Sequence, residues 1–135
     1  MNGKITYFNP EGLIKIPAFS QAVMTEGSGK TIYIGGQNAI DVKGNLIGKG
    51  SVSLQAEQAM RNVQTALAAA GATFKDVIKM NIYILQGQNA IEAFKASQPF
   101  IKDRSQPPAI TGIFVAGLAN PEYLIEIEAI AFTVL

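Results

Sequence analysis

The sequence contains no cysteine, no histidine and no tryptophan among its 135 residues. Without cysteine the chain can form no disulfide and has no thiolate nucleophile. Without histidine it lacks the commonest general base and metal ligand. These absences argue against a metal-dependent enzyme, and we expect neither a metal nor a cofactor.

Charge is also sparse, since charged residues make up 16 % of the chain and the formal net charge is +1. The lysines are scattered and form no basic stripe, so the sequence gives no electrostatic case for binding nucleic acid or an anionic membrane. No uncharged apolar run is long enough to span a bilayer, and the N-terminus lacks the apolar segment of a signal peptide. We therefore expect a cytoplasmic protein.

The composition is that of one globular domain. Hydrophobic residues make up 48 % of the chain, enough for a real core at this length, and no linker or low-complexity run divides it. We expect a single domain over residues 1–135.

Hydrophobic periodicity predicts the order of the elements. Short strands at 4–8, 20–24 and 31–34 come first, and the Glu26-Gly27-Ser28-Gly29 stretch between the last two is typical of a hairpin loop. A helix follows, with Ser53 as its predicted N-cap and Gly71 just after its end.

The second half of the chain predicts a central strand, a weaker helix and two more strands. In residues 77–85 both the odd and the even positions are apolar, except for a lysine and an asparagine, as in a strand covered on both faces. The helix starts near residue 90, turns Ile91, Phe94 and Ile101 inward, and is expected to break near Gln98 because Pro99 cannot donate a helical hydrogen bond.

Two helices can cover only one face of a single mixed sheet, so the pattern predicts an α+β fold with one sheet face left open. The strands at 77–85 and 109–116 are apolar on both faces, and an open face of this kind would expose more apolar surface than a monomer usually shows. We therefore expect self-association through that face.

The last strand carries two carboxylates on one face, because Glu126 and Glu128 are two residues apart. A solvated edge and a ligand cleft both account for them, and the pattern does not choose. Glu128 is expected to pair with Lys79 or Lys15, within the chain or between subunits. Asn81, a polar residue in an apolar strand, is expected to have a hydrogen-bond partner.

Four blocks then resemble one family in order and spacing: AFSQA at 18–22, IYIGGQ at 32–37, the stretch 58–84, and IEIEAIA at 125–131. They resemble the RidA/YjgF family of enamine/imine deaminases. The resemblance implies a chorismate-mutase-like fold with two helices on one face of the sheet. It also implies a homotrimer whose sheets form a central barrel, with small-molecule clefts at the subunit interfaces.

The resemblance also shows what this chain has lost. Deaminases of the family usually bind the substrate carboxylate through the arginine of a PAR motif, and the matching segment here is PAI, with Ile110 in place of the arginine. Phe19 stands where the family has a tyrosine, Phe94 where an asparagine is common, and Gly35 where a serine is common. The cleft should therefore be apolar and bind a carboxylate poorly.

The family resemblance implies that Glu126 is the residue that orients the attacking water. The implied ligand-binding residues are Phe19, Gly35, Gly36, Phe94, Ile110 and Thr111. Arg104 lies six residues before Ile110, and two interpretations stay open: it supplies a replacement cation, or it is a solvated surface residue.

Two functions follow from this site. The first is a divergent deaminase or hydrolase that acts on an imine or enamine without the usual carboxylate anchor, with weak or no activity on 2-imino acids. The second is a non-catalytic trimer that binds a metabolite or has a regulatory role. Ribonuclease activity, a third possibility, has little visible means in a chain without histidine or a basic patch.

Overall fold

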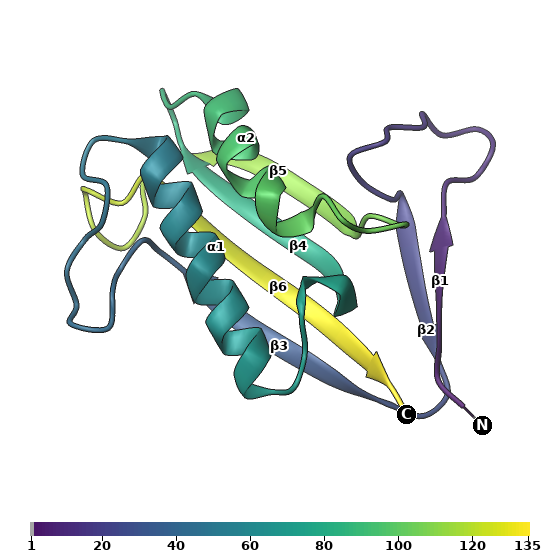
Figure 1. The fold of residues 1–135 in the computed structure, drawn as a ribbon. Coiled ribbons are helices and arrows are strands. Elements are labelled where there is room, and N and C mark those ends of the chain that lie inside the picture. Colours follow the sequence, from purple (N-terminus) through teal and green to yellow (C-terminus); the bar gives the residue numbers. More distant parts are fainter. Residues whose placement is uncertain (1) are drawn as a thin grey trace.

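The structure is a computed structural model that describes residues 2–135. Its elements follow one another along the chain as shown in Figure 1. They are β1 (Lys4–Phe8), β2 (Ala22–Glu26), β3 (Gly29–Gln37), α1 (Val52–Ala69), the 3-10 helix η1 (Phe74–Asp76), β4 (Val77–Leu85), α2 (Ala90–Ile101), β5 (Ala109–Val115) and β6 (Ile125–Val134).

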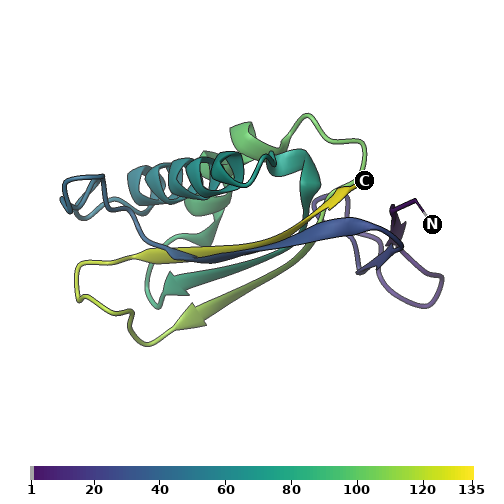
Figure 2. The same ribbon diagram turned by 90° about the horizontal axis from the view of Figure 1, so that it is seen from below.

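The main sheet has four strands in the order β3-β6-β4-β5. Strand β6 runs antiparallel to both of its neighbours, whereas β4 and β5 are parallel and are joined by the α2 crossover. Both helices lie on the same side of this sheet, and within residues 2–135 no helix covers the other side (Figure 2). The predicted α+β fold with two helices on one face of a mixed sheet is confirmed. The described strands form an open sheet, so the barrel and the trimer stay predictions.

Strands β1 and β2 form a separate two-stranded sheet, so the predicted hairpin between β2 and β3 is wrong. Strand β2 pairs with β1, while β3 pairs with β6 from Gly29↔Val134 to Gln37↔Ile127. The Gly27-Ser28 link carries the chain from one sheet to the other. A turn signal in the sequence is local and does not reveal a strand partner about a hundred residues away.

Helix α1 begins two residues earlier than predicted, because its N-cap is Ser51 and not Ser53. The Ser51 side chain accepts a hydrogen bond from the Leu54 N–H at 3.1 Å. At the other end Gly71 adopts φ +75°, the left-handed conformation expected just after a helix. The buried face of α1 consists of Val52, Gln55, Ala56, Ala59, Met60, Val63 and Leu67.

Helix α2 continues through Pro99 to Ile101, so the predicted break at Gln98 is wrong. The Lys102 N–H still donates to the Gln98 carbonyl at 3.0 Å, which closes the last turn after the proline. The inward orientation of Ile91 is also wrong, since it is 64 % exposed, whereas Phe94 does point toward the sheet, with its ring near Gly112 of β5, and is 42 % exposed. Instead Ala93 and Ser97 are the buried residues of α2.

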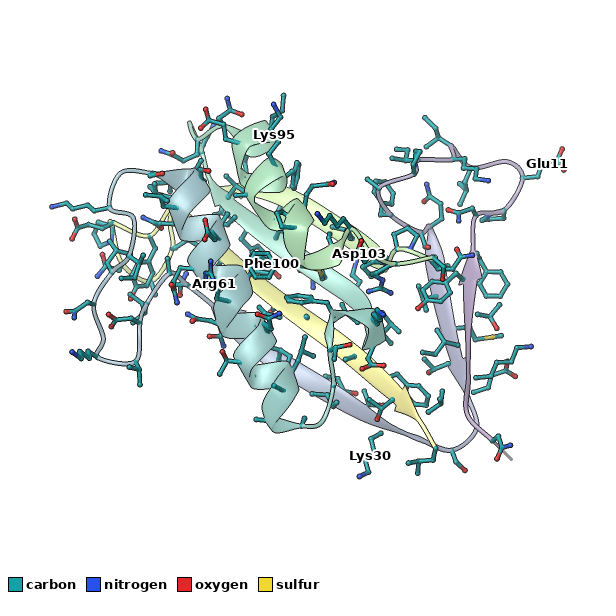
Figure 3. The ribbon with its side chains drawn as sticks, in the orientation of Figure 1. Glu11, Lys30, Arg61, Lys95, Phe100 and Asp103 are labelled. Carbon is teal, nitrogen blue, oxygen red and sulfur yellow. The ribbon has the colours of Figure 1, made fainter. Side chains whose placement is uncertain are left out.

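The C-terminal end of α2 packs on its neighbours through Phe100. Its ring meets that of Phe74 in η1 edge-on, with 5.8 Å between centroids. The guanidinium of Arg61, on α1, lies 6.0 Å from the Phe100 centroid (Figure 3). Phe100 therefore connects both helices and η1 at one point.

The open face of the sheet is partly apolar, as predicted. Tyr33 on β3 is 76 % exposed and Ile113 on β5 is 46 % exposed. On β3 the residues that face the helices are better covered, since Ile34 is buried and Ile32 is partly buried. Within residues 2–135, no helix has the length and hydropathy of a membrane span.

Candidate functional site

A hollow of about 530 Å³ opens between α2 and the edge of the sheet formed by β4 and β5. No charged side chain lines it. The lining consists of Ala18, Phe19, Met80, Ile82, Phe94, Ser97, Gln98, Ile101, Ile110, Thr111 and Gly112. Four of the predicted ligand-binding residues, Phe19, Phe94, Ile110 and Thr111, thus lie around one apolar hollow.

The loop that carries Phe19 is fastened to the start of β5 by Ser20. The buried Ser20 donates from its backbone N–H to the Pro108 carbonyl at 2.9 Å and from Oγ to the Pro107 carbonyl at 2.6 Å. These two bonds bring residues separated by almost ninety positions together and hold Phe19 near Ile110. Ser20 is part of the AFSQA block, but its two partners lie too far along the chain for any local pattern to indicate them.

Glu126 lies away from the apolar hollow that contains Ile110. It alternates with the buried Ile125 and Ile127 on β6, so its side chain is on the open face of the sheet. Its carboxylate lies against Gly36: a Cβ at that position would be 2.8 Å from Cδ of Glu126 and closer still to Oε2. Glu126 does not line the apolar hollow. The predicted site residues therefore fall into two groups within one chain.

A second hollow, of about 370 Å³, contains Gly35, the last of the predicted ligand-binding residues. It lies on the open-face side, between β3, β6 and β4. Its lining consists of Tyr33, Ile34, Gly35, Lys79, Asn81, Glu128, Ala129 and Ile130. Unlike the first hollow, it contains two charged side chains of opposite sign.

Glu128 is held by neutral partners rather than by a lysine. Its Oε1 accepts hydrogen bonds from Tyr83 Oη at 2.7 Å and from Asn81 Nδ2 at 2.9 Å. These bonds stabilise the ionised form and lower the pKa of Glu128. The predicted partner for Asn81 is confirmed, whereas neither Lys79 nor Lys15 pairs with Glu128 within the described chain.

The family of the chain follows from a match over most of its length. A family model described as Endoribonuclease L-PSP matches residues 13–133. The chain belongs to this family, which is the RidA/YjgF family. A 2-iminobutanoate/2-iminopropanoate deaminase from Homo sapiens is 34 % identical over 118 residues, covering 86 % of this chain and 80 % of the human one.

Solved structures of the RidA/YjgF family share the fold. A Yersinia pestis protein of unknown function, YyfB of the conserved Rid family, superposes with a TM-score of 0.83 at 36 % identity, covering 94 % of this chain and 97 % of that chain. The YjgF gene product of Escherichia coli gives a TM-score of 0.68 at 28 % identity, with 78 % and 83 % covered.

Arg104 does not reach the apolar hollow that contains Ile110. Its guanidinium donates to the Gln106 carbonyl at 2.9 Å, to the Phe74 carbonyl at 2.5 Å and to Tyr7 Oη at 3.2 Å. Burial lowers the pKa of Arg104. Arg104 is partly buried and links β1, η1 and the loop before β5, so the interpretation as a solvated surface residue is wrong. A role as cation in a cleft between subunits stays a prediction.

Proposed function

We propose that this RidA/YjgF protein is a homotrimer that hydrolyses an imine or enamine lacking a carboxylate, in an apolar cleft between subunits. The observation that carries the proposal is the hollow around Ile110, which has no charged lining residue. Relatives named as 2-iminobutanoate/2-iminopropanoate deaminases act on substrates that bear a carboxylate. Placing such an anion in an apolar hollow without a cation would cost its hydration energy.

The chemistry assigned to the cleft needs one base and one water. Glu126 accepts a proton from the water while the water oxygen forms a bond to the carbon of the C=N group. Glu126 passes this proton to the nitrogen. The remaining hydroxyl proton moves to the nitrogen as the C–N bond breaks, which releases a carbonyl compound and an amine or ammonia and leaves Glu126 ionised. A carboxylate whose position is fixed can orient the water before attack, which is the role proposed for Glu126.

The separation of the two residue groups supports a cleft built from two subunits. In one chain Glu126 is on the open face, while the hollow around Ile110 opens at the β5 edge under α2. Packing of the open face against another copy is a way to bring a Glu126 carboxylate to a hollow. The partly apolar character of that face, with Tyr33 and Ile113 exposed, favours such packing.

The test compares two matched substrates, 2-iminobutanoate and butan-2-imine, in which a methyl group replaces the carboxylate. We expect the natural protein to accelerate hydrolysis of butan-2-imine over a no-protein control and 2-iminobutanoate little. The Ile110→Arg variant should gain about tenfold or more on 2-iminobutanoate, because a guanidinium binds a carboxylate with two charge-assisted hydrogen bonds. Ammonia release after rapid in situ generation of each imine is the measurement.

Two controls separate the roles of the residues. Ile110→Leu keeps the hollow apolar and should not acquire activity on 2-iminobutanoate. Glu126→Gln should lose turnover of butan-2-imine by about a hundredfold, a typical loss for a general base. Rapid turnover of 2-iminobutanoate by the natural protein would refute the assignment of a neutral substrate.

A non-catalytic ligand-binding trimer is the second candidate function. It is favoured by the position of Glu126 outside the apolar hollow within one chain. Under this alternative neither imine is hydrolysed by the natural protein or by Ile110→Arg. A neutral hydrophobic amide should then bind equally well to the natural protein and to Glu126→Gln, and less well to Ile110→Arg, as measured by calorimetry.

A further inference from the structure

The open face of the sheet carries more negative than positive charge. The four strands of the main sheet contain two lysines, Lys30 and Lys79, and no arginine. Lys30 alternates in step with Ile32 and Ile34, which face the helices, so it is not on the open face. Lys79 is therefore the cation that these strands place on the open face, which also carries the carboxylates of Glu126 and Glu128.

Lys79 and Glu128 line the same hollow, yet they do not pair within the chain. The Lys79 ammonium donates to Thr111 Oγ1 at 2.7 Å, on β5. Glu128 accepts from Asn81 and Tyr83 on β4 through Oε1 alone. Among residues 2–135 the ion pairs within 4 Å are Lys49–Glu122 and Arg61–Glu57, both away from this face. The two charges are thus held apart by neutral partners.

We propose that Lys79 of one copy forms an ion pair with Glu128 of a neighbouring copy of this chain. The inference rests on the homotrimer of the proposed function and specifies one contact within it. The hydrogen bonds to Glu128 keep its carboxylate ionised, so covering the open face without a counterion would bury an uncompensated charge. Lys79 on the same face supplies the required counterion when the occupant of that face is a second copy.

The placement of the two groups also fits a head-to-tail contact. Lys79 extends toward β5, which forms one edge of the sheet, whereas Glu128 is on β6, which lies between β3 and β4. The cation and the carboxylate are therefore offset across the strands. In such a contact the β5 side of one copy meets the β6 side of the next. The same Lys79–Glu128 pair then repeats at each contact, and three copies can close into a ring.

The test is a charge swap followed by sedimentation over a dilution series. Lys79→Glu and Glu128→Lys should each raise the dissociation constant of the trimer by about tenfold or more, because each places like charges together. The double variant Lys79→Glu with Glu128→Lys should return it to within about threefold of the natural value, because the pair is re-formed with its charges exchanged. Lys95→Glu, on the far side of α2 (Figure 3), is the matched control for net charge and should leave assembly unchanged.

Each possible result decides a different point. A natural protein that sediments as a monomer refutes the proposed trimer and the ion pair with it. A trimer that the single variants do not weaken refutes the ion pair alone, and so does failure of the double variant to recover. If circular dichroism shows a variant unfolded, Glu128→Gln replaces it: loss of the pair then appears as a weaker trimer with reduced salt dependence, and an unchanged salt dependence refutes it.

Discussion

At the scale of single residues, the missing side chain at Gly36 determines where the Glu126 carboxylate lies. The carboxylate occupies the space that a Cβ of residue 36 would fill. Gly35, one position earlier, has no atom within 4 Å of its own hypothetical Cβ. Two adjacent glycines therefore have different structural roles, which the GG pair in the sequence does not disclose.

This difference predicts unequal effects of two identical substitutions. Gly36→Ala should lower the free energy of unfolding by about 0.5–1 kcal/mol, because the Glu126 carboxylate must turn aside and its flexible side chain allows this at small cost. Gly35→Ala should change it by less than about 0.5 kcal/mol, since a methyl group there meets no neighbour. Urea unfolding of both variants measures the difference, and equal free energies would show that Glu126 does not rest on Gly36.

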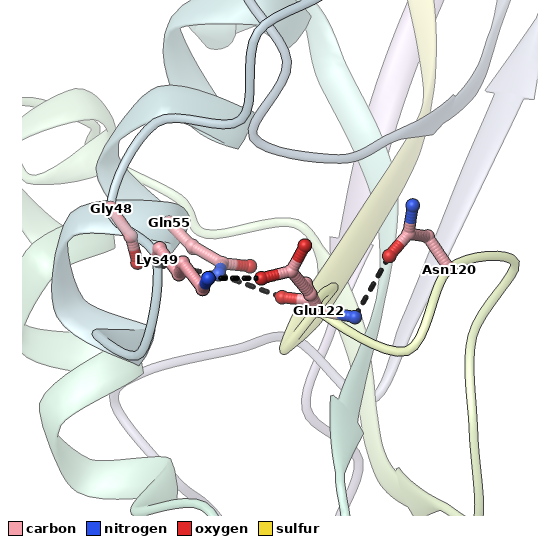
Figure 4. Close-up of polar contacts among 5 residues, drawn as sticks. All are labelled: Gly48, Lys49, Gln55, Asn120 and Glu122. Carbon is pink, nitrogen blue, oxygen red and sulfur yellow. Dashed lines mark hydrogen bonds and ion pairs between the residues drawn. The ribbon is translucent and has the colours of Figure 1, made fainter.

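At the scale of elements, Gln55 joins α1 to the loop between β5 and β6. It is fully buried and donates to the Gly48 carbonyl at 3.3 Å and to the Glu122 carbonyl at 3.0 Å, while its Oε1 accepts from the Leu124 N–H at 2.8 Å. Around it Glu122 also pairs with Lys49 and donates its N–H to Asn120 (Figure 4). The strand β6 that carries Glu126 starts directly after this network.

Removing the Gln55 amide should be among the costlier single changes in α1. Gln55→Ala leaves the Glu122 carbonyl and Leu124 N–H without partners and opens a cavity, for an expected loss of about 2–4 kcal/mol. Gln64→Ala, at an exposed position of the same helix, is the control and should have little effect. Thermal and urea unfolding give both values, and a loss below about 1 kcal/mol for Gln55→Ala would contradict the assignment.

The elements also show how far the sequence alone can predict this fold. Periodicity located both helices and most strands, because an amphipathic face of α1 or the apolar run of β4 is a local property. It misplaced the cap of α1, where Ser51 and Ser53 are both plausible, and it paired β2 with the wrong strand. The polar Gln55 within an apolar helix face gave no signal of its partners, since two of the three lie 67 and 69 residues away.

The candidate site was only partly predictable for the same reason. The residues around the apolar hollow came from resemblance to the RidA/YjgF family, and Phe19, Phe94 and Ile110 do meet there. Their separation from Glu126 could not be predicted, because it depends on which sheet face each strand turns to the helices. The contacts of Arg104 could not be predicted either, because two of its partners are backbone carbonyls and the third is the hydroxyl of Tyr7, 97 residues away.

At the scale of the whole molecule, the absence of histidine and cysteine affects how stability depends on pH. No side chain of the chain has an ordinary pKa between about 5 and 8, so the free energy of unfolding should vary little across that range. The Tyr83–Glu128 hydrogen bond affects the free energy of unfolding both below and above this pH range. It lowers the pKa of Glu128 below the ordinary 4.5 and raises that of Tyr83 above the ordinary 10.0.

The directions of these two pKa shifts predict that the free energy of unfolding is nearly constant at intermediate pH and falls at both acid pH (the acid limb) and alkaline pH (the alkaline limb). A lowered carboxyl pKa gives stability that is present above pH 4.5 and is lost as the pH falls through the folded value. A raised phenol pKa gives stability that is present below pH 10.0 and is lost as the pH rises through the folded value. Tyr83→Phe removes the bond and should make both limbs shallower than in the natural protein.

Urea unfolding at fixed protein concentration from pH 3 to pH 11 measures both limbs. Tyr123→Phe is the matched control, because the Tyr123 hydroxyl makes no hydrogen bond within residues 2–135. A Tyr83→Phe variant that keeps the natural acid limb would mean that Asn81 alone holds Glu128. In that case the carboxylate would still be ionised on the open face, and covering that face would still require a cation such as Lys79.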